Sequence, residues 1–313
     1  MHVTALAGGI GAGKFLRGLV RAVAPTDVTV IVNTADDIAM HGLHVSPDVD
    51  SVTYWLGDAF DRERGWGRRD ETFRATEELR RFDAEAAWFN LGDLDLATHL
   101  FRTRLLAEGR TLSEVTARAA ARFGVASQIL PMSDDPVTTR VSAVALGREL
   151  DLHFQEYWVK RHAQDEVKAV RYEGVERAAP APGVLEAIGS AETIVVCPSN
   201  PVASIGPILA VPGIRAALSA RRERVVGVSG IVGGAPLAGM ADKLMPVAGV
   251  EVTAAGAADC YRGLLAGWVI DEIDRDLAPR IEATGVRVAV TDTIMTDDAK
   301  AEALARTVLG LLT

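Results

Sequence analysis

The residues near the start of the chain with the clearest chemical potential are glycines and a lysine in the segment TALAGGIGAGK. Four glycines separate a short apolar stretch from a segment with helical apolar spacing: Gly8, Gly9, Gly11 and Gly13. A strand, a glycine turn and a helix leave backbone N–H groups free at the helix N-terminus, where a phosphate can bind. Lys14, at the expected entrance of that helix, would add a positive charge. The segment predicts a phosphate site; the alternative is a tight turn that serves only helix–strand packing.

Two better-known phosphate motifs do not fit this segment. Residues 8–14 match G-x-x-x-x-G-K, but Phe15 stands where a P-loop carries the Ser or Thr that ligates magnesium. The dinucleotide fingerprint G-x-G-x-x-G fails because Lys14 occupies its last position. Neither an ordinary P-loop NTPase nor a standard NAD site is therefore predicted.

Four carboxylates follow the glycine segment within fifteen residues of one another: Asp36, Asp37, Asp48 and Asp50. Mg²⁺ takes oxygen ligands, and one or two acids beside substrate phosphates are a usual set. We expect Asp37, Asp48 and Asp50 to supply metal ligands. The alternative is that Asp48 or Asp50 caps a helix after Pro47 while residues 36–37 form a solvated turn. His41, His44 and His99 lack zinc-site spacing, and we expect them to support or pack against the site.

The elements that must position these residues are those of an α/β fold. Residues 1–33 form a strand–helix–strand unit, which implies a parallel sheet with a right-handed crossover. Further strands are expected at 126–130, 193–197, 225–229 and 286–290, a hairpin at 141–154, and a last helix at 299–312. We predict one domain, residues 1–313, with a Rossmann-like, mostly parallel sheet, helices on both faces, and a mainly helical insertion at about 59–124.

Polar residues follow several of these strands, at the sheet edge where ligands gather in α/β folds. Besides the acids above, they are Asn33, Ser133, Asp134, Asp135, Ser199, Asn200 and Pro201. Within the insertion, residues 71–82 and 96–108 have helical periodicity, and Thr111 or Ser113 is expected to cap a third helix.

Composition narrows the class of protein. With 313 residues and a formal net charge of −9, a general nucleic-acid-binding surface is not expected. No apolar run is long enough to span a membrane, and the chain opens on a strand rather than a signal peptide. Two distant cysteines, Cys197 and Cys260, fit a cytoplasmic protein without structural disulfides.

Eight segments, in order along nearly the whole chain, resemble the 2-phospho-L-lactate transferases of coenzyme F-420 biosynthesis. They include GGIG, VNTADD, SPDVDSV, LGDLDLATH, LPMSDDPV, HFQEYW, PSNPVASIGP and GMADKL, at residues 8–11, 32–37, 46–52, 91–99, 130–137, 153–158, 198–207 and 239–244. A single such segment would be weak evidence, but eight in order are specific.

The resemblance implies transfer of a phospholactyl or phosphoenolpyruvyl group from a guanosine diphosphate-linked donor to the riboflavin-like deazaflavin Fo. GMP leaves, Mg²⁺ is required, and a homodimer is expected. Carried over by position, Asp48 and Asp50 lie nearest the metal and the acceptor hydroxyl, and residues 8–13 hold the diphosphate. Residues 199–201 then hold the nucleotide, with residues 133–135 along the same edge.

We expect an in-line displacement in which Asp50 orients or deprotonates the acceptor hydroxyl, with Asp48 or Asp37 on the metal. Asp50→Asn should then lower turnover by about 10² or more. A nucleotide-sugar-binding regulatory protein from a related group is the alternative function. The three-carbon acid of the donor, phospholactate, phosphoenolpyruvate or phosphoglycerate, stays open.

Overall fold

The computed structural model describes residues 1–312, and its centre is a seven-stranded sheet. The strands lie in the order β14-β13-β10-β9-β1-β2-β5, and every neighbouring pair is parallel. They are β1 (Val3–Ala7), β2 (Val28–Val32), β5 (Gln128–Pro131), β9 (Thr193–Val196), β10 (Val225–Val228), β13 (Gly267–Ile270) and β14 (Arg287–Val290). The predicted Rossmann-like fold class is confirmed. Only β13 was not predicted, because a four-residue segment that opens on glycine gives a weak strand signal.

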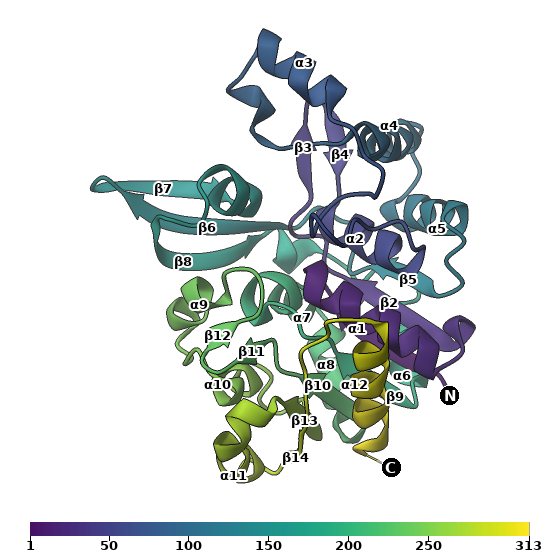
Figure 1. Ribbon diagram of the computed structural model, residues 1–313, viewed down its shortest axis with the longest axis vertical. Coiled ribbons are helices and arrows are strands. Elements are labelled where there is room, and N and C mark those ends of the chain that lie inside the picture. The colour runs from purple at the N-terminus through teal and green to yellow at the C-terminus, as the bar shows by residue number, and fades with distance from the viewer. Residues whose placement is uncertain (313) are drawn as a thin grey trace.

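Helices cover both faces of the sheet, as predicted (Figure 1). Val3, Ala5 and Ala7 of β1 belong to one hydrophobic core, whereas Leu6 belongs to the other, as expected for alternating side chains. The first core includes residues of α1 (Gly9–Ala22), α2 (Pro47–Leu56) and α12 (Asp298–Gly310). The second includes residues of α6 (Val184–Ser190), α7 (Gly206–Ala210), α8 (Ile214–Ser219), α10 (Ala254–Asp259) and α11 (Ala278–Glu282).

The middle of the segment between β2 and β5 extends away from the sheet in Figure 1, whereas its helices α2 and α5 (Leu112–Arg122) contact the sheet. The segment contains β3 (Ile38–Met40), β4 (Leu43–Val45), α2, α3 (Arg74–Phe82), η2 (Ala86–Trp88), α4 (Asp93–Ala107) and α5. Helix α3 begins three residues later than expected because Glu71 caps α4, accepting from the N–H groups of Leu94 (2.6 Å) and Asp95 (2.9 Å). Thr111 caps α5 in a reciprocal pair with Glu114, which confirms one of the two expected caps.

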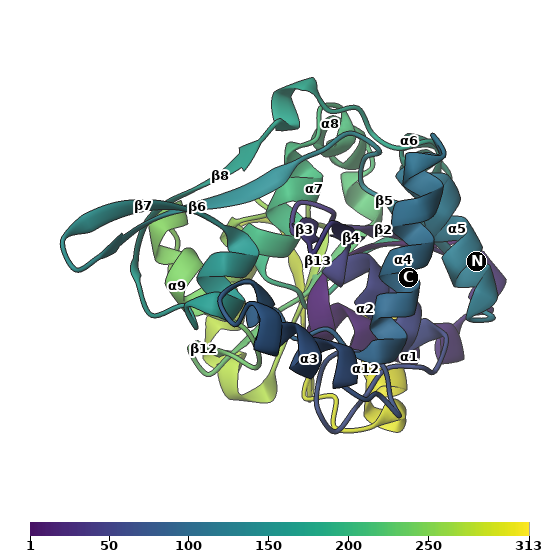
Figure 2. The same cartoon turned by 90° about the horizontal axis from the view of Figure 1, so that it is seen from above.

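A second, antiparallel sheet projects beside the first (Figures 1 and 2). Its order is β7-β6-β8, with β6 (Thr138–Ala145), β7 (Arg148–His153) and β8 (Glu166–Glu173). The predicted hairpin is therefore confirmed. The third strand was not predicted, because β8 is largely exposed and its side chains are mostly charged or polar.

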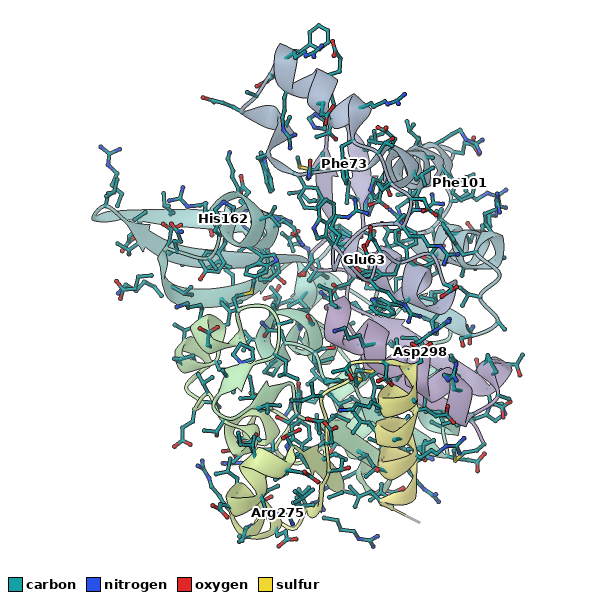
Figure 3. The ribbon with its side chains drawn as sticks, viewed as in Figure 1. Glu63, Phe73, Phe101, His162, Arg275 and Asp298 are labelled. Carbon is teal, nitrogen blue, oxygen red and sulfur yellow. The ribbon has the colours of Figure 1, made fainter. Side chains whose placement is uncertain are left out.

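Short elements complete the chain. They are η1 (Pro25–Asp27), η3 (Glu156–Lys160), η4 (Val175–Arg177), η5 (Pro201–Ile205), η6 (Arg222–Arg224), β11 (Ile231–Val232), β12 (Ala235–Pro236), α9 (Ala241–Leu244), η7 (Pro246–Ala248) and η8 (Glu272–Leu277). Arg62, after α2, donates to Asp298 at the start of α12 over 3.0 Å (Figure 3 labels Asp298). None of the helices in residues 1–312 combines the length and apolar character needed to cross a membrane.

Candidate active site

The candidate site lies where the chain leaves β1, between β9 and β2. Strands after β1 are added on one side of it and later strands on the other, so this edge is the topological switch point at which α/β sheets bind ligands. The N–H of Gly8 donates to Ser199 Oγ over 3.3 Å, which joins the turn after β1 to the turn after β9. Asn33, after β2, contacts the same region through Asp48. The structure therefore brings four predicted residues together here, Gly8, Asn33, Asp48 and Ser199.

Each glycine of the turn has a steric reason to be glycine. Gly9 has φ +73°, a left-handed conformation that disfavours side chains. A Cβ on Gly8 would lie 2.6 Å from Asp48 Oδ2 and 2.7 Å from the Cβ of Ser204. A Cβ on Gly11 would collide with the carbonyl of Pro198, and one on Gly13 with the indole of Trp55. The number of glycines thus does not distinguish phosphate binding from packing.

The start of α1 is nevertheless suited to an anion. The helix begins at Gly9; its N-cap residue, Gly8, makes no side-chain cap, its first turn has no acidic residue, and the N–H of Gly9 faces Asp48. Free N–H groups and the helix dipole favour a negative charge there. The predicted position of Lys14 was wrong: because the helix starts within the glycine segment, Lys14 lies in its second turn. Its side chain is exposed and forms no ion pair with residues 1–312.

Two buried carboxylates face the turn without a cationic partner. Asp48 is 6% exposed, and its Oδ2 accepts from Asn33 Nδ2 over 2.9 Å. Burial raises the pKa of Asp48 to about 6, and the N–H of Gly9 opposes that rise. Burial, and then the charge of Asp48, raise the pKa of Asp36 well above its usual range. The two acids therefore share a region that lacks positive charge.

Asp37 lies beside this pair and is partly satisfied. Its Oδ2 accepts from Ser46 Oγ (2.5 Å) and is 2.8 Å from Nε2 of His44. Burial raises the pKa of Asp37, and the hydrogen bond from His44 opposes it. Oδ1 of Asp37 and Oδ1 of Asp36 are both buried and have no hydrogen-bond partner within residues 1–312. Unpartnered buried oxygens on adjacent acids mark a place where a cation or a donor group would be stabilised.

Asp50 has a different environment from the one the sequence predicted. Both of its oxygens contact the guanidinium of Arg102. Oδ2 lies 3.1 Å from Nη1, and Oδ1 accepts a hydrogen bond from Nη2. Arg102 is 2% exposed, so this is a buried ion pair. Nδ1 of His99 lies 3.6 Å from Asp50 Oδ2. The pair neutralises the charge of Asp50 and holds its carboxylate toward α4.

Sequence reasoning did not identify Arg102, and it left Asp36 out of the expected metal ligands. A signal for the first was present: Asp95, His99 and Arg102 recur at spacings of four and three, on one face of α4, and all three are buried. Such a polar stripe on a helix predicts a buried polar network. Nothing in the sequence separates Asp36 from Asp37.

Ser133, Asp134 and Asp135 hydrogen-bond to neighbouring loops rather than to the glycine turn. Ser133 Oγ donates to the carbonyl of Ala179 (2.6 Å) and accepts from the N–H of Asp135. Asp134 Oδ1 accepts from the N–H (2.7 Å) and hydroxyl of Ser113, in the first turn of α5. Asp135 Oδ2 accepts from the N–H of Ala179. These hydrogen bonds hold the loop after β5 against Ala179 and the start of α5.

Asn200 and Pro201 begin the short helical segment after β9. Asn200 Oδ1 accepts from the N–H groups of Val202 (2.9 Å) and Ala203 (3.0 Å), which caps the segment, and Pro201 is its buried first residue. Ala203 also accepts weakly from Asn33 Nδ2 (3.4 Å). These residues hold the loop that carries Ser199 against the turn.

The acids at this edge fit a partly solvated metal site rather than a closed one. Within residues 1–312, no three or more His, Cys, Asp or Glu side chains are grouped so as to hold a metal ion. Mg²⁺ usually binds through one or two carboxylates, several waters and substrate phosphates. Asp36, whose Oδ1 has no hydrogen-bond partner, and Asp48, whose charge acts on Asp36, form no ion pair within residues 1–312 and meet that requirement.

Solved structures support the fold. Two structures of a Bacillus halodurans protein, one described as a member of the UPF0052 family, match with TM-scores of 0.63 and 0.60 at 19% and 18% sequence identity. Each match covers 98% of this chain and at least 98% of the other chain. At this identity the likeness establishes only the fold.

Sequence relatives establish the family. The family model described as 2-phospho-L-lactate transferase CofD matches residues 3–309. A phosphoenolpyruvate transferase of Streptomyces griseus is 51% identical, covering 99% of this chain and 98% of that protein. A 2-phospho-L-lactate transferase of Methanosarcina acetivorans is 41% identical, covering 98% and 97%. This chain therefore belongs to the CofD family and is a transferase of the phosphoenolpyruvate or phospholactate type.

Proposed function

We propose that this transferase moves a phosphorylated three-carbon acid from a guanosine diphosphate-linked donor to the terminal hydroxyl of the deazaflavin Fo. GMP is the second product, and the reaction belongs to coenzyme F-420 biosynthesis. The support is family membership together with the sheet-edge site. The observation that carries the proposal is the packing of Asp48 directly against Gly8, at the uncapped start of α1. This arrangement sets a carboxylate beside N–H groups suited to a diphosphate.

The donor acid is proposed to be phosphoenolpyruvate. Relatives from Streptomyces griseus and Streptomyces coelicolor, 51% and 50% identical, are named phosphoenolpyruvate transferases. The relative named for phospholactate has a lower identity of 41%. Since the two acids differ by few atoms, direct competition between the donors is the appropriate test.

Asp36 and Asp48 are the residues proposed to hold Mg²⁺. Both are buried, both have raised pKa values, and Oδ1 of Asp36 lacks a partner within residues 1–312. When bound, the ion would neutralise charge on the diphosphate, which is the main requirement of phosphoryl-type transfer. Asp50 is less suited to this role because Arg102 already neutralises it.

The groups of the protein are proposed to position the substrates and stabilise charge rather than to form a covalent intermediate. The acceptor oxygen forms a bond to the phosphorus that carries the acid, the bridging P–O bond breaks, and GMP leaves with the bonding electrons. The N–H groups at the start of α1 stabilise the diphosphate. Asp37, supported by His44 and Ser46, accepts the hydrogen bond of the attacking hydroxyl through its free Oδ1 and takes its proton as the bond to phosphorus forms.

The test is mass spectrometry of the product formed from Fo, Mg²⁺ and each guanylated donor, carrying phosphoenolpyruvate, phospholactate or phosphoglycerate. We expect a new phosphodiester of Fo and an equal amount of GMP, fastest with the phosphoenolpyruvate donor. Faster transfer from another donor would overturn the choice of acid. Absence of product with all three, together with unchanged Fo fluorescence on titration, would overturn the transferase assignment to Fo and favour the nucleotide-sugar binder.

A further inference from the structure

A buried polar cluster joins α4 to the site at one end of α2. Arg102 Nη1 lies 3.1 Å from Asp50 Oδ2, 3.3 Å from the carbonyl of His44, and 3.2 Å from Nδ1 of His99. Helix α4 packs against β4, which carries His44 (Figure 1). His44 in turn contacts Asp37, so the cluster is continuous with the acids of the site.

The contact with Arg102 fixes the tautomer of His99. A guanidinium can only donate hydrogen bonds, so Nδ1 of His99 must accept. Burial lowers the pKa of His99 to about 4, so the ring is neutral at pH 7. A neutral imidazole that accepts at Nδ1 carries its proton on Nε2. His99 therefore presents an Nε2–H donor.

This donor is unused by the protein. His99 is 1% exposed, and its Nε2 is buried without a hydrogen-bond partner in the described chain. A buried donor left unpaired costs free energy, and native proteins rarely leave one without a reason. In the same cluster, Oδ1 of Asp37 is a buried acceptor that also lacks a partner.

A hydroxyl group could satisfy either of these unpaired atoms. Its oxygen accepts from a donor such as His99, and its hydrogen is donated to a carboxylate such as Asp37. An anionic group is disfavoured, because Arg102, the cation that contacts His99, is already paired with Asp50, and Asp37 adds a further carboxyl group to the cluster. The chemistry therefore selects a neutral polyol over a phosphate or a carboxylate.

We propose that His99 Nε2–H is a substrate-binding donor for a hydroxyl of the polyhydroxylated acceptor alcohol, and that Arg102 is the positioning residue that fixes its tautomer. The role of the alcohol as acceptor rests on the proposed function. The tautomer of His99 and its control by Arg102 do not rest on the proposed function. Because His99 is 1% exposed, this binding requires the side chains around Nε2 to move.

The tautomer is tested by NMR on protein labelled with ¹⁵N-histidine. The protein contains six histidines. His99 is assigned by loss of its signals in His99→Gln. We expect a protonated Nε2 and an unprotonated Nδ1 at pH 7 in the wild type, and loss of that single tautomer in Arg102→Met. A proton on Nδ1 in the wild type, or an unchanged tautomer in Arg102→Met, would overturn the inference.

The binding role is tested with two matched variants. In His99→Gln the terminal amide lies near the place of Nε2 and keeps the donor, whereas in His99→Asn it lies near the place of Nδ1. We expect KM for Fo to rise about 10-fold in His99→Asn, with a much smaller rise in His99→Gln. KM for the guanylated donor should stay unchanged in both.

The outcomes distinguish the proposed binding role of His99 from the proposed transferase function. Equal rises of KM for Fo in both variants, or a rise of KM for the guanylated donor, would overturn the role of His99. Thermal unfolding of both variants checks that a shared loss of fold does not produce equal effects. A wild-type enzyme that does not transfer to Fo would instead count against the proposed function, and the NMR result would still decide the tautomer and the role of Arg102.

Discussion

Two acids on the same helix, separated by one residue, have opposite surroundings. Asp48 faces the glycine turn, where Asn33 is its side-chain hydrogen-bond partner and Asp36 adds a second buried charge. Asp50 faces α4, where Arg102 contacts both of its oxygens. Burial is nearly equal, at 6% exposure for each. The difference between the two regions is therefore charge compensation rather than depth.

This comparison assigns the regions different tasks. A buried carboxylate without a cation is costly to ionise, and an arriving cation removes that cost. A buried carboxylate already paired with arginine is fixed in place and gains little from a second cation. The acids at the glycine turn are thus suited to bind a cation, whereas Arg102 of α4 holds Asp50 in position.

Asp48→Asn should produce the largest effect. The amide oxygen still accepts from Asn33, so the local fold is retained, but the carboxylate charge beside the diphosphate site is lost. We expect kcat to fall roughly 10³-fold, as for removal of a major electrostatic group from a transition state. Steady-state kinetics with saturating Mg²⁺ and both substrates would measure it.

The matched control is Asp134→Asn, the same change at the sheet edge in a residue that contacts Ser113 instead of the turn. Its kcat should remain near that of the wild type. Near-normal kcat in Asp48→Asn would place the essential charge elsewhere and remove the contrast drawn between the two regions.

The sequence was sufficient to predict every strand of the seven-stranded sheet except β13, and the edge at which residues after β1, β2 and β9 meet. Apolar runs such as residues 28–32 are strand signals that do not depend on distant partners, and the ends of parallel strands necessarily meet at one edge. The difference between the surroundings of Asp48 and those of Asp50 was not predictable in the same way. It depends on Arg102, which is 52 residues from Asp50 in the sequence and meets it only after α4 packs.

The residues after β5 are a second case in which local sequence does not show which distant segments a side chain contacts. Ser133, Asp134 and Asp135 have the composition of a ligand-binding loop, but the same side chains also satisfy backbone groups in turns and helix starts. Their hydrogen bonds to Ala179 and to Ser113, in the first turn of α5, join segments that local sequence cannot bring together.

Arg102→Met should have the next largest effect, on stability. It leaves Asp50 buried without its partner, so the free energy of unfolding should fall by roughly 3–4 kcal/mol. Asp50→Asn combined with Arg102→Met removes both charges and should recover a large part of the loss. Urea unfolding of the single and double variants measures this, and additive losses would contradict a coupled pair.

Asp95 sharpens the comparison through pH. It accepts from the hydroxyl of Tyr54 (2.6 Å), and burial, then the charge of Asp50, raise its pKa to about 7. The folded state therefore keeps a proton that the unfolded state loses near pH 4, so stability falls as pH rises from about 4 to 7. Relative to Asp95→Asn, the wild type should lose roughly 2–3 kcal/mol between pH 5 and pH 8. Equal pH slopes in urea unfolding would contradict this.

Asp134→Ala should have the smallest effect, and it tests whether the loop after β5 belongs to the binding region at all. The substitution removes the acceptor of the Ser113 N–H and hydroxyl at the start of α5. Loss of a helix-start contact of this kind costs about 1 kcal/mol. Thermal unfolding should show that loss while KM for the guanylated donor is unchanged, because the carboxylate is already engaged by α5. A clear rise in that KM would instead give Asp134 the ligand-binding role expected from its sequence and extend the binding region from the glycine turn to β5.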